Sequence, residues 1–409
     1  MTPRNNLPPG KEDYSMKKAF VLALAVLATS VVAASAQGSQ TASARSLASF
    51  NCSKTITLPF VTPLTGGAGF LGTEQMSWAK YAVKTLAPGL GLKVKLVGGD
   101  TPVEQGPAPA QTLAQKYIGT PSVLALLGPS TSGAAAASTK TYAAAKLAHI
   151  SPSATRTTLT KTVGGTFDGS QAFFRDVPGD YIQGPSDANF MINSLHVKKV
   201  VIMDFQEPYS LGLAGAVDST LKAKGVSTIR LSAPNTTTDY SAYVTKVPSD
   251  ADIVFFPTQK PGDAQTFAQQ LIEQGKKAKV FGGDGSNDSS QFKQPGSYVS
   301  NFAPDITGIA ADAKLIAGWK KDNAGKAVGS FGPPSYGAVQ IALTAISKAC
   351  KAGHGSTTRL AVFHTFKKVS IKNWILGGSF KWSTKSNDPL NAKFYIFQIQ
   401  SNGSYKLVG

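Results

Sequence analysis

The sequence predicts an α/β protein of two similar lobes, each a parallel sheet flanked by helices. Strand–loop–helix units recur through residues 55–155 and again through residues 197–285, and each series is long enough to form one lobe. The chain also starts with a segment typical of exported proteins. Two similar lobes on an exported chain favour a cleft that captures a small solute over a site that carries out a reaction.

The first series contains four short apolar or β-branched runs that end at Gly, Pro or Ser clusters, as buried parallel strands do. We predict these strands at residues 55–61, 92–97, 123–127 and 148–151. The helices between them are predicted at residues 74–86, 108–117 and 133–146. Ser and Thr residues immediately before the last helix can cap its N-terminus.

The second series repeats this order of elements. Its strands are predicted at residues 199–203, 228–231, 252–256 and 279–281, and its helices at residues 211–224, 240–247 and 263–274. The remaining chain is less repetitive, with helices predicted at residues 312–321, 336–351 and 359–368 and a final strand at residues 394–400. An extra helical pair would complete the first lobe, and the final strand would join the second.

The N-terminus has the three parts of a signal peptide. Two lysines follow Met16, an apolar run leads to Ala34, and residues 34–36 (ASA) form a small-residue cleavage site. Its strictly apolar part is too short to cross about 30 Å of hydrocarbon. We therefore assign residues 1–36 to the signal, with Met16 as an alternative start, and residues 37–53 to a flexible leader. The mature protein is expected to be soluble and periplasmic or otherwise extracytoplasmic.

The net charge of +18, from 41 basic and 23 acidic residues, raises the question of a nucleic-acid partner. The lysines are dispersed in short groups, without a long basic run or interleaved aromatic residues. Together with export, this favours a solvated basic surface and no nucleic-acid partner. The two cysteines, Cys52 and Cys350, are a disulfide candidate in an oxidising compartment, and two unpaired thiols are the alternative.

The motifs for enzyme chemistry are weak. Residues 67–72 (GAGFLG) have the spacing of a dinucleotide fingerprint, but the loop before them is long and Asp100 lies beyond the usual spacing of about 20 residues. The four histidines lack metal-ligand spacing. Residues 128–133 (GPSTSG) lack the order of a nucleophile elbow. We therefore predict no enzyme activity, no cofactor and no metal.

Small polar residues follow two successive strands of the first series. Ser132 lies at a predicted helix start, where free N–H groups and the helix dipole favour a carboxylate. Residues 151–155 (SPSAT) end the next strand and can add hydroxyl and backbone donors. Ordinary capping and turn chemistry is the alternative, but the recurrence at neighbouring strand ends favours a ligand site.

These segments resemble the leucine/isoleucine/valine-binding family of substrate-binding proteins for ABC importers, which have the type I periplasmic binding fold. The resemblance runs from about residue 55 to residue 408 and is carried by four segments in order: residues 63–66 (PLTG), 128–132 (GPSTS), 150–155 (ISPSAT) and 207–212 (EPYSLG). It implies a three-segment hinge, with lobes dividing near residues 174–177, 297–302 and 375–380. The N-terminal lobe would comprise residues 54–175 plus 302–377, and the C-terminal lobe residues 176–301 plus 378–409.

The resemblance also implies roles for individual residues. Ser132, Ser153 and Thr155 would hold the carboxylate of the ligand, Tyr209 would cover the ligand from the second lobe, and Asp284 would receive an α-ammonium group. An anion site on one lobe and a carboxylate on the other suit a zwitterion.

The side-chain pocket departs from the family pattern. The first loop offers Phe70 or Leu71 where the family often has an aromatic ring, and Gln259 stands where amino-acid binders can carry tyrosine. The ligand could therefore be a different amino acid, an amide or an aromatic acid.

The function implied is a monomeric binding protein that captures a small amino-acid-like ligand by hinge closure and delivers it to an ABC permease in the membrane. A ligand-sensing receptor of the same fold is the first alternative, and an exported α/β enzyme is the second.

Overall fold

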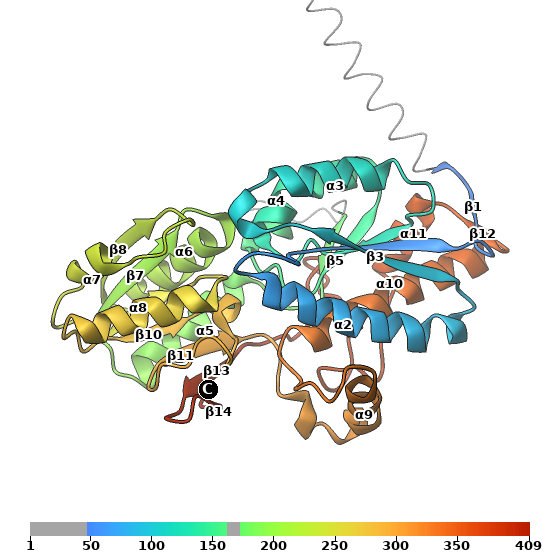
Figure 1. The fold of residues 1–409 in the computed structure, drawn as a ribbon. Helices are drawn as coiled ribbons and strands as arrows, with labels where there is room; N and C mark the ends of the chain where they lie inside the picture. Colours follow the sequence, from blue (N-terminus) through green and yellow to red (C-terminus); the bar gives the residue numbers. More distant parts are fainter. Residues whose placement is uncertain (1–46, 162–171) are drawn as a thin grey trace, which may run out of the picture.

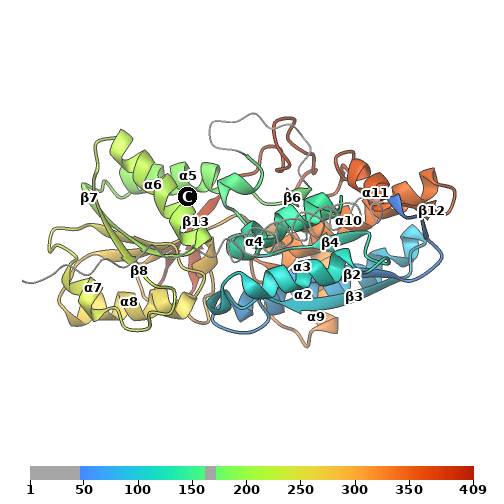
Figure 2. The same ribbon diagram turned by 90° about the horizontal axis from the view of Figure 1, so that it is seen from above.

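The computed structural model describes residues 47–161 and 172–409. The predicted signal peptide therefore lies outside the described residues. Figures 1 and 2 show two lobes side by side, each built on a sheet with helices on both faces. The predicted α/β fold class is confirmed.

The sheet of the first lobe has five parallel strands in the order β3-β2-β4-β5-β6. These strands are β2 (Ile56–Thr62), β3 (Val94–Asp100), β4 (Ala125–Leu127), β5 (Ala148–Ser151) and β6 (Phe173–Arg175). Every residue of β4, β5 and β6 is buried, which explains why buried and exposed residues do not alternate along these strands.

Helices cover both faces of this sheet. The larger core joins one face to α2 (Gly69–Leu86), α10 (Gly332–Ala352) and α11 (Arg359–Phe366). The smaller core joins the other face to α3 (Ala108–Ile118) and α4 (Ser132–Ala144). The helix α9 (Ala313–Asp322) packs on the outside of α2, where the rings of Trp78 and Trp319 stack with centroids 4.5 Å apart.

A disulfide follows directly after β1, a strand that Figure 1 shows at the end of this lobe away from the second lobe. It joins Cys52 to Cys350 near the end of α10, with an S–S distance of 2.02 Å. Beside it, the short strands β1 (Phe50–Asn51) and β12 (Ser356–Thr357) pair in antiparallel fashion. The N-terminal part of the described chain is therefore fastened to α10 by both a covalent bond and a strand pair.

The sheet of the second lobe has seven strands in the order β14-β13-β11-β10-β9-β7-β8. Its five parallel strands are β7 (Lys199–Phe205), β8 (Ser227–Ala233), β9 (Ile253–Phe256), β10 (Lys279–Gly282) and β11 (Tyr298–Asn301). Two antiparallel strands, β13 (Tyr395–Ile399) and β14 (Tyr405–Leu407), extend the edge beyond β11.

The strand β7 shows how the second sheet is buried on both faces. Its residues Val201 and Met203 belong to the core under α7 (Ser241–Thr245) and α8 (Pro261–Glu273). The alternate residues Val200 and Ile202 belong to the core under α5 (Asp180–Asn193) and α6 (Pro208–Ala223). Successive side chains of a strand point to opposite faces, so both must be apolar when helices cover both faces.

The chain passes between the two sheets three times, and the crossings share one apolar cluster. Val177, Phe302 and Phe394 come from the first, second and third crossing, and they pack together with Leu71 and Phe331. Three chain segments therefore connect the lobes, and they share a small apolar core of their own. Such a connection allows hinge motion.

The third crossing runs along the first lobe before it enters the second sheet. Phe380 belongs to the larger core of the first lobe. Further along, the Nδ2 of Asn387 donates to the carbonyl oxygen of Phe173 in β6 at 2.9 Å. The lobe boundary expected near residues 375–380 stays a prediction, and these contacts favour a later boundary within this crossing, between residues 390 and 395.

Candidate functional site

Ser132 is the first residue of α4, directly at the carboxyl end of the first sheet. The preceding Thr131 caps the helix, since its Oγ1 accepts the N–H of Ala134 at 3.3 Å. The Oγ of Ser132 accepts the backbone N–H of Arg156 at 3.2 Å. This bond uses only a lone pair of the oxygen, so the hydroxyl hydrogen can still be donated to an anion.

Ser153 and Thr155 follow β5 and differ in their hydrogen bonding. The Oγ of Ser153 donates to the carbonyl oxygen of Ser130 at 2.7 Å and accepts from Nε2 of Gln75 at 2.9 Å. The hydroxyl of Thr155 is fully buried and has no hydrogen-bond partner of standard geometry in the described part of the chain. Its side chain nevertheless lies close enough to the carboxyl of Asp180 to lower the pKa of that group by hydrogen bonding, while Ser153 holds its loop against the loop before α4.

Tyr209 and Asp284 meet inside the second lobe. Tyr209 lies in the first turn of α6, and its hydroxyl donates to Oδ1 of Asp284 at 2.9 Å and accepts the N–H of Gly285 at 3.0 Å. Both side chains are buried. Glu207 fixes the start of α6 by accepting the N–H groups of Tyr209 and Ser210. The sequence analysis expected separate roles for Tyr209, as a cover of the ligand, and for Asp284, as the partner of an ammonium group, and the structure brings the two into direct contact.

Further carboxylates surround Asp284. Burial and, to a smaller extent, the charge of Asp180 raise the pKa of Asp284, while hydrogen bonds from Gln183 and Tyr209 lower it, and the net result is a pKa of about 7. Burial also raises the pKa of Asp180 to about 6 and that of Asp187 well above its ordinary value. Neither carboxylate oxygen of Asp180 has a partner of standard geometry among the described residues. This part of the second lobe is therefore rich in acceptors and short of donors.

Asp180, Gln183 and Asp187 were not found by sequence reasoning, although they carry a recognisable signal. They stand at positions i, i+3 and i+7 of α5, so they share one face of the helix. That spacing becomes visible only when residues 180–193 are recognised as helical.

Arg156 was also missed by sequence reasoning. Its Nη1 donates across the lobes to the carbonyl oxygen of Pro208 at 3.0 Å, immediately before Tyr209. A second contact of this kind joins Nδ2 of Asn235 to the carbonyl oxygen of Val103 at 3.3 Å. The helices α4 and α6 also touch, and they meet at the junction of the lobes in Figures 1 and 2. The two predicted halves of the site therefore face each other at short range.

The three predicted pocket residues lie in different surroundings. Phe70 is half-buried, contacts Phe331 edge to face at 5.6 Å, and lines two cavities of about 440 and 640 Å³. Leu71 is buried in the apolar cluster of the hinge. Gln259 lies beside Gly285, where an added Cβ would come within 3.1 Å of the Cα of Gln259. Of the three, the structure thus brings Gln259 closest to the Tyr209–Asp284 pair.

The glycine-rich segment at residues 67–72 has a packing explanation. A Cβ on Gly72 would lie 1.8 Å from the carbonyl oxygen of Pro63, so α2 can approach the end of β2 only with glycine there. Among the described residues, no group of three or more His, Cys, Asp or Glu side chains is arranged to hold a metal ion. In the same part of the chain, none of the helices combines the length and apolar character that a membrane crossing requires.

The sequence of the whole two-lobed region matches one family model, described as periplasmic binding protein, over residues 55–404. The chain belongs to the periplasmic binding protein family. This family is made up of solute-binding proteins rather than enzymes, and its members act outside the cytoplasm. The resemblance to Leu/Ile/Val-binding proteins and the solute-binding function are therefore confirmed.

Individual members of the family give the scale of the similarity. The chain is 25% identical over 350 residues to an amino acid binding protein of Pseudomonas aeruginosa, covering 84% of this chain and 90% of that protein. The leucine binding protein LivK of Thermotoga maritima has a similar structure, with a TM-score of 0.76 and 21% identity over 87% of this chain and 98% of that chain. A solute binding protein of R. palustris in complex with benzoate has a TM-score of 0.73 and 16% identity over 87% and 96% of the two chains.

Proposed function

We propose that this protein captures a small amino-acid-like solute between its lobes and delivers it to the permease of an ABC importer. One observation carries the proposal. The hydroxyl of Thr155 in the first lobe lowers the pKa of Asp180 in the second lobe, and the charge of Asp180 in turn acts on Asp284. The helix α4, which begins at Ser132, touches α6 of the second lobe. Donors on one side and carboxylates on the other complement the two charged ends of a zwitterion.

Within this proposal, the carboxylate of the ligand is bound by Ser132, Thr155 and the loop that Ser153 holds in place. The ammonium group is bound by Asp284, which Tyr209 orients. Asp180 adds negative charge on the same side. Gln259 and Phe70 contact the variable part of the solute, and the position of Leu71 in the hinge cluster favours a supporting role for that residue.

The mechanism is hinge closure without a reaction. A ligand that contacts both lobes stabilises their approach in proportion to its differential affinity for the closed form, and that form docks on the permease. The known ligands of related proteins define the range to be tested. The T. maritima protein is named for leucine, and the R. palustris protein holds benzoate. The protein is expected to act as an exported monomer.

Native mass spectrometry of the purified protein, followed by a thermal-shift screen of amino acids, amides and aromatic acids, tests the proposal. A bound ligand raises the melting temperature according to its concentration relative to its Kd. The double variant Ser132→Ala/Thr155→Ala should lose this rise. The matched control is Ser138→Ala, because Ser138 lies in the same helix and its hydroxyl donates to the carbonyl oxygen of Ala134, within α4 itself. An unchanged thermal shift in the double variant would place the site elsewhere.

A further inference from the structure

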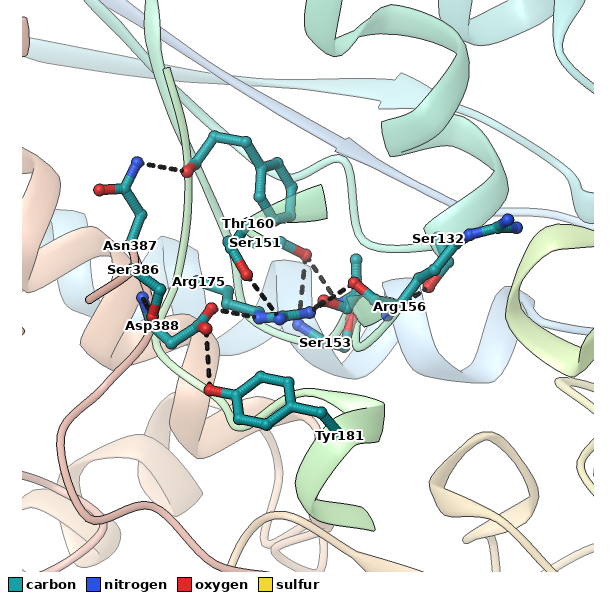
Figure 3. A network of polar contacts seen from close by, with 12 residues as sticks. Ser132, Ser151, Ser153, Arg156, Thr160, Arg175, Tyr181, Ser386, Asn387 and Asp388 are labelled. Atoms are coloured by element: carbon teal, nitrogen blue, oxygen red, sulfur yellow. Dashed lines mark hydrogen bonds and ion pairs between the residues drawn. The ribbon is translucent and has the colours of Figure 1, made fainter. Parts of the chain in front are cut away.

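Arg175, the last residue of β6, makes an unusually complete set of hydrogen bonds for a buried cation. Its side chain is fully buried. The Nη1 donates to the carbonyl oxygens of Ala154 at 3.1 Å and Arg156 at 3.0 Å, and Nη2 donates to the hydroxyl of Thr160 at 2.7 Å. The guanidinium therefore binds the backbone of the loop after β5 on both sides of Thr155 (Figure 3).

The charge of Arg175 is balanced by a residue that lies far away in the sequence. Its Nε donates to Oδ1 of Asp388 at 2.7 Å, and the two side chains are completely shielded from solvent. Asp388 belongs to the third crossing, shortly before the chain enters β13. In Figure 3 the guanidinium lies between this carboxylate and the loop that contains Ser153.

The first crossing joins the same network. The hydroxyl of Tyr181, in the first turn of α5, donates to Oδ2 of Asp388 at 2.9 Å. Next to it, the backbone N–H of Asp180 donates to the carbonyl oxygen of Thr155 at 2.8 Å. Two of the three crossings are thus hydrogen-bonded, directly or through one carboxylate, to the loop of residues 153–156.

We propose that Arg175 is a positioning residue that couples the hinge to the ligand loop. Because one rigid guanidinium holds the loop backbone and the third crossing together, a rotation of the crossings cannot leave the loop unchanged. The inference rests on the proposed binding role of this loop. The loop carries the Thr155 hydroxyl, so Arg175, Asp388 and Tyr181 act on the ligand through its position and make no contact with the ligand themselves.

Hydrogen–deuterium exchange of the ligand-free protein tests the coupling, since the amides of Ser153, Ala154 and Arg156 are bonded only to serine hydroxyls and report local opening. Asp388→Asn should speed exchange in a peptide covering residues 153–158 by about tenfold, and Tyr181→Phe by about threefold, with β7 unaffected. The matched control, Asp322→Asn, removes an exposed partner of Lys84 and should change neither region.

Equal acceleration in the loop and in β7 would show a general loss of stability and would overturn the proposal. Unchanged exchange in the loop would overturn it too. If Asp388→Asn does not fold, Tyr181→Phe decides the question alone, because it removes one hydroxyl and no charge. The measurement needs no ligand, so a failure of the proposed function in the ligand screen is distinguishable from a failure of this coupling.

Discussion

The hydroxyl of Tyr209 donates to Oδ1 of Asp284 at 2.9 Å while it accepts the backbone N–H of Gly285. The phenol therefore connects the start of α6 to the loop after β10 and fixes the orientation of the carboxylate. Because the pair is buried, the charge state of Asp284 depends on which charged groups lie beside it. An ammonium group would favour the ionised form of Asp284, which burial disfavours.

Ligand affinity should therefore depend on pH. The pKa of Asp284 in the free protein is about 7, and an ammonium group pairs only with the ionised carboxylate. Below pH 7, binding must first remove a proton, so Kd should rise by up to about tenfold for each pH unit. Between pH 7 and 8.5, Kd should be nearly constant. Calorimetry with the ligand found in the screen measures this profile.

The variant Asp284→Asn provides the control for this profile. It should bind the ligand more weakly at pH 8 and show little change between pH 5.5 and 8. A wild-type Kd that is equal at pH 5.5 and pH 8 would contradict the pairing of Asp284 with a cationic group.

The variant Tyr209→Phe should weaken ligand binding and move the pH profile upward. Removing the hydroxyl removes a hydrogen bond that lowers the pKa of Asp284, so the carboxylate should ionise at higher pH. Loss of one bond to a charged group corresponds to about 1.5–3 kcal/mol, or roughly 10- to 150-fold in Kd. This is the upper limit of the rise at pH 7, because the bond already exists in the ligand-free protein and only its strengthening on ionisation of Asp284 counts toward Kd.

The control for Tyr209→Phe is Tyr240→Phe. Tyr240 is buried in the other core of the same lobe and donates to the carbonyl oxygen of Thr237. It should affect stability and leave Kd unchanged. If both variants change Kd alike, the effect of Tyr209 is one of general stability.

Most strands and helices of the two series could be predicted because their sequences follow the local rules. β5 was predicted with its observed bounds, Ala148–Ser151, since an apolar run ends there at a Ser-Pro turn. The helix α5 was missed because it contains Pro185 and Gly184, which normally interrupt a helix. Here Gly184 packs so closely on α6 that an added Cβ would lie 2.4 Å from the Cβ of Ala216, so tertiary contact decides the conformation.

The candidate site could be predicted only where its residues follow strand ends. Ser132, Thr155 and Asp284 follow such ends, Ser132 at the start of α4, Thr155 in the loop after β5 and Asp284 directly after β10. Arg156 and Arg175 could not be found in this way, because their roles come from partners more than 50 residues away, in α6 and in the third crossing. No local pattern specifies such long-range pairs. The ligand-binding roles themselves remain predictions.

The stability of the ligand-free protein should fall as pH rises from 5.5 to 8. Burial raises the pKa of Glu74 and of Glu207 to about 7, above the value of about 4.5 for an unperturbed glutamate. Between these values the folded protein binds more protons than the unfolded chain, so stability decreases with pH. The contribution of Asp388 to stability depends on pH in the opposite direction. Arg175 outweighs the effect of burial and lowers the pKa of Asp388, so this contribution to stability is lost only under acidic conditions.

Thermal melting at several pH values measures this slope, and Glu74→Gln should reduce it. One oxygen of glutamine can still accept the N–H of Gly332, which Glu74 accepts at 2.8 Å at the start of α10. Glu273→Gln, at the exposed end of α8, is the surface control. A melting temperature that rises between pH 5.5 and 8 would contradict the raised pKa values.

Reduction of the disulfide should destabilise the first lobe without changing the ligand site. The bond between Cys52 and Cys350 joins residues 298 positions apart, so it removes much conformational freedom from the unfolded chain. Its loss should lower the free energy of unfolding by about 2–5 kcal/mol. Ligand affinity should be unchanged, because the disulfide lies at the end of the lobe that is away from α4 and α6 (Figure 1). Denaturant unfolding of the wild type with and without a phosphine reductant, beside the variant Cys52→Ser/Cys350→Ser, measures the effect.

The reductant should shift the unfolding midpoint of the wild type and leave that of the variant unchanged. Equal midpoints for all samples would show that the strand pair β1–β12 alone fastens this end of the lobe.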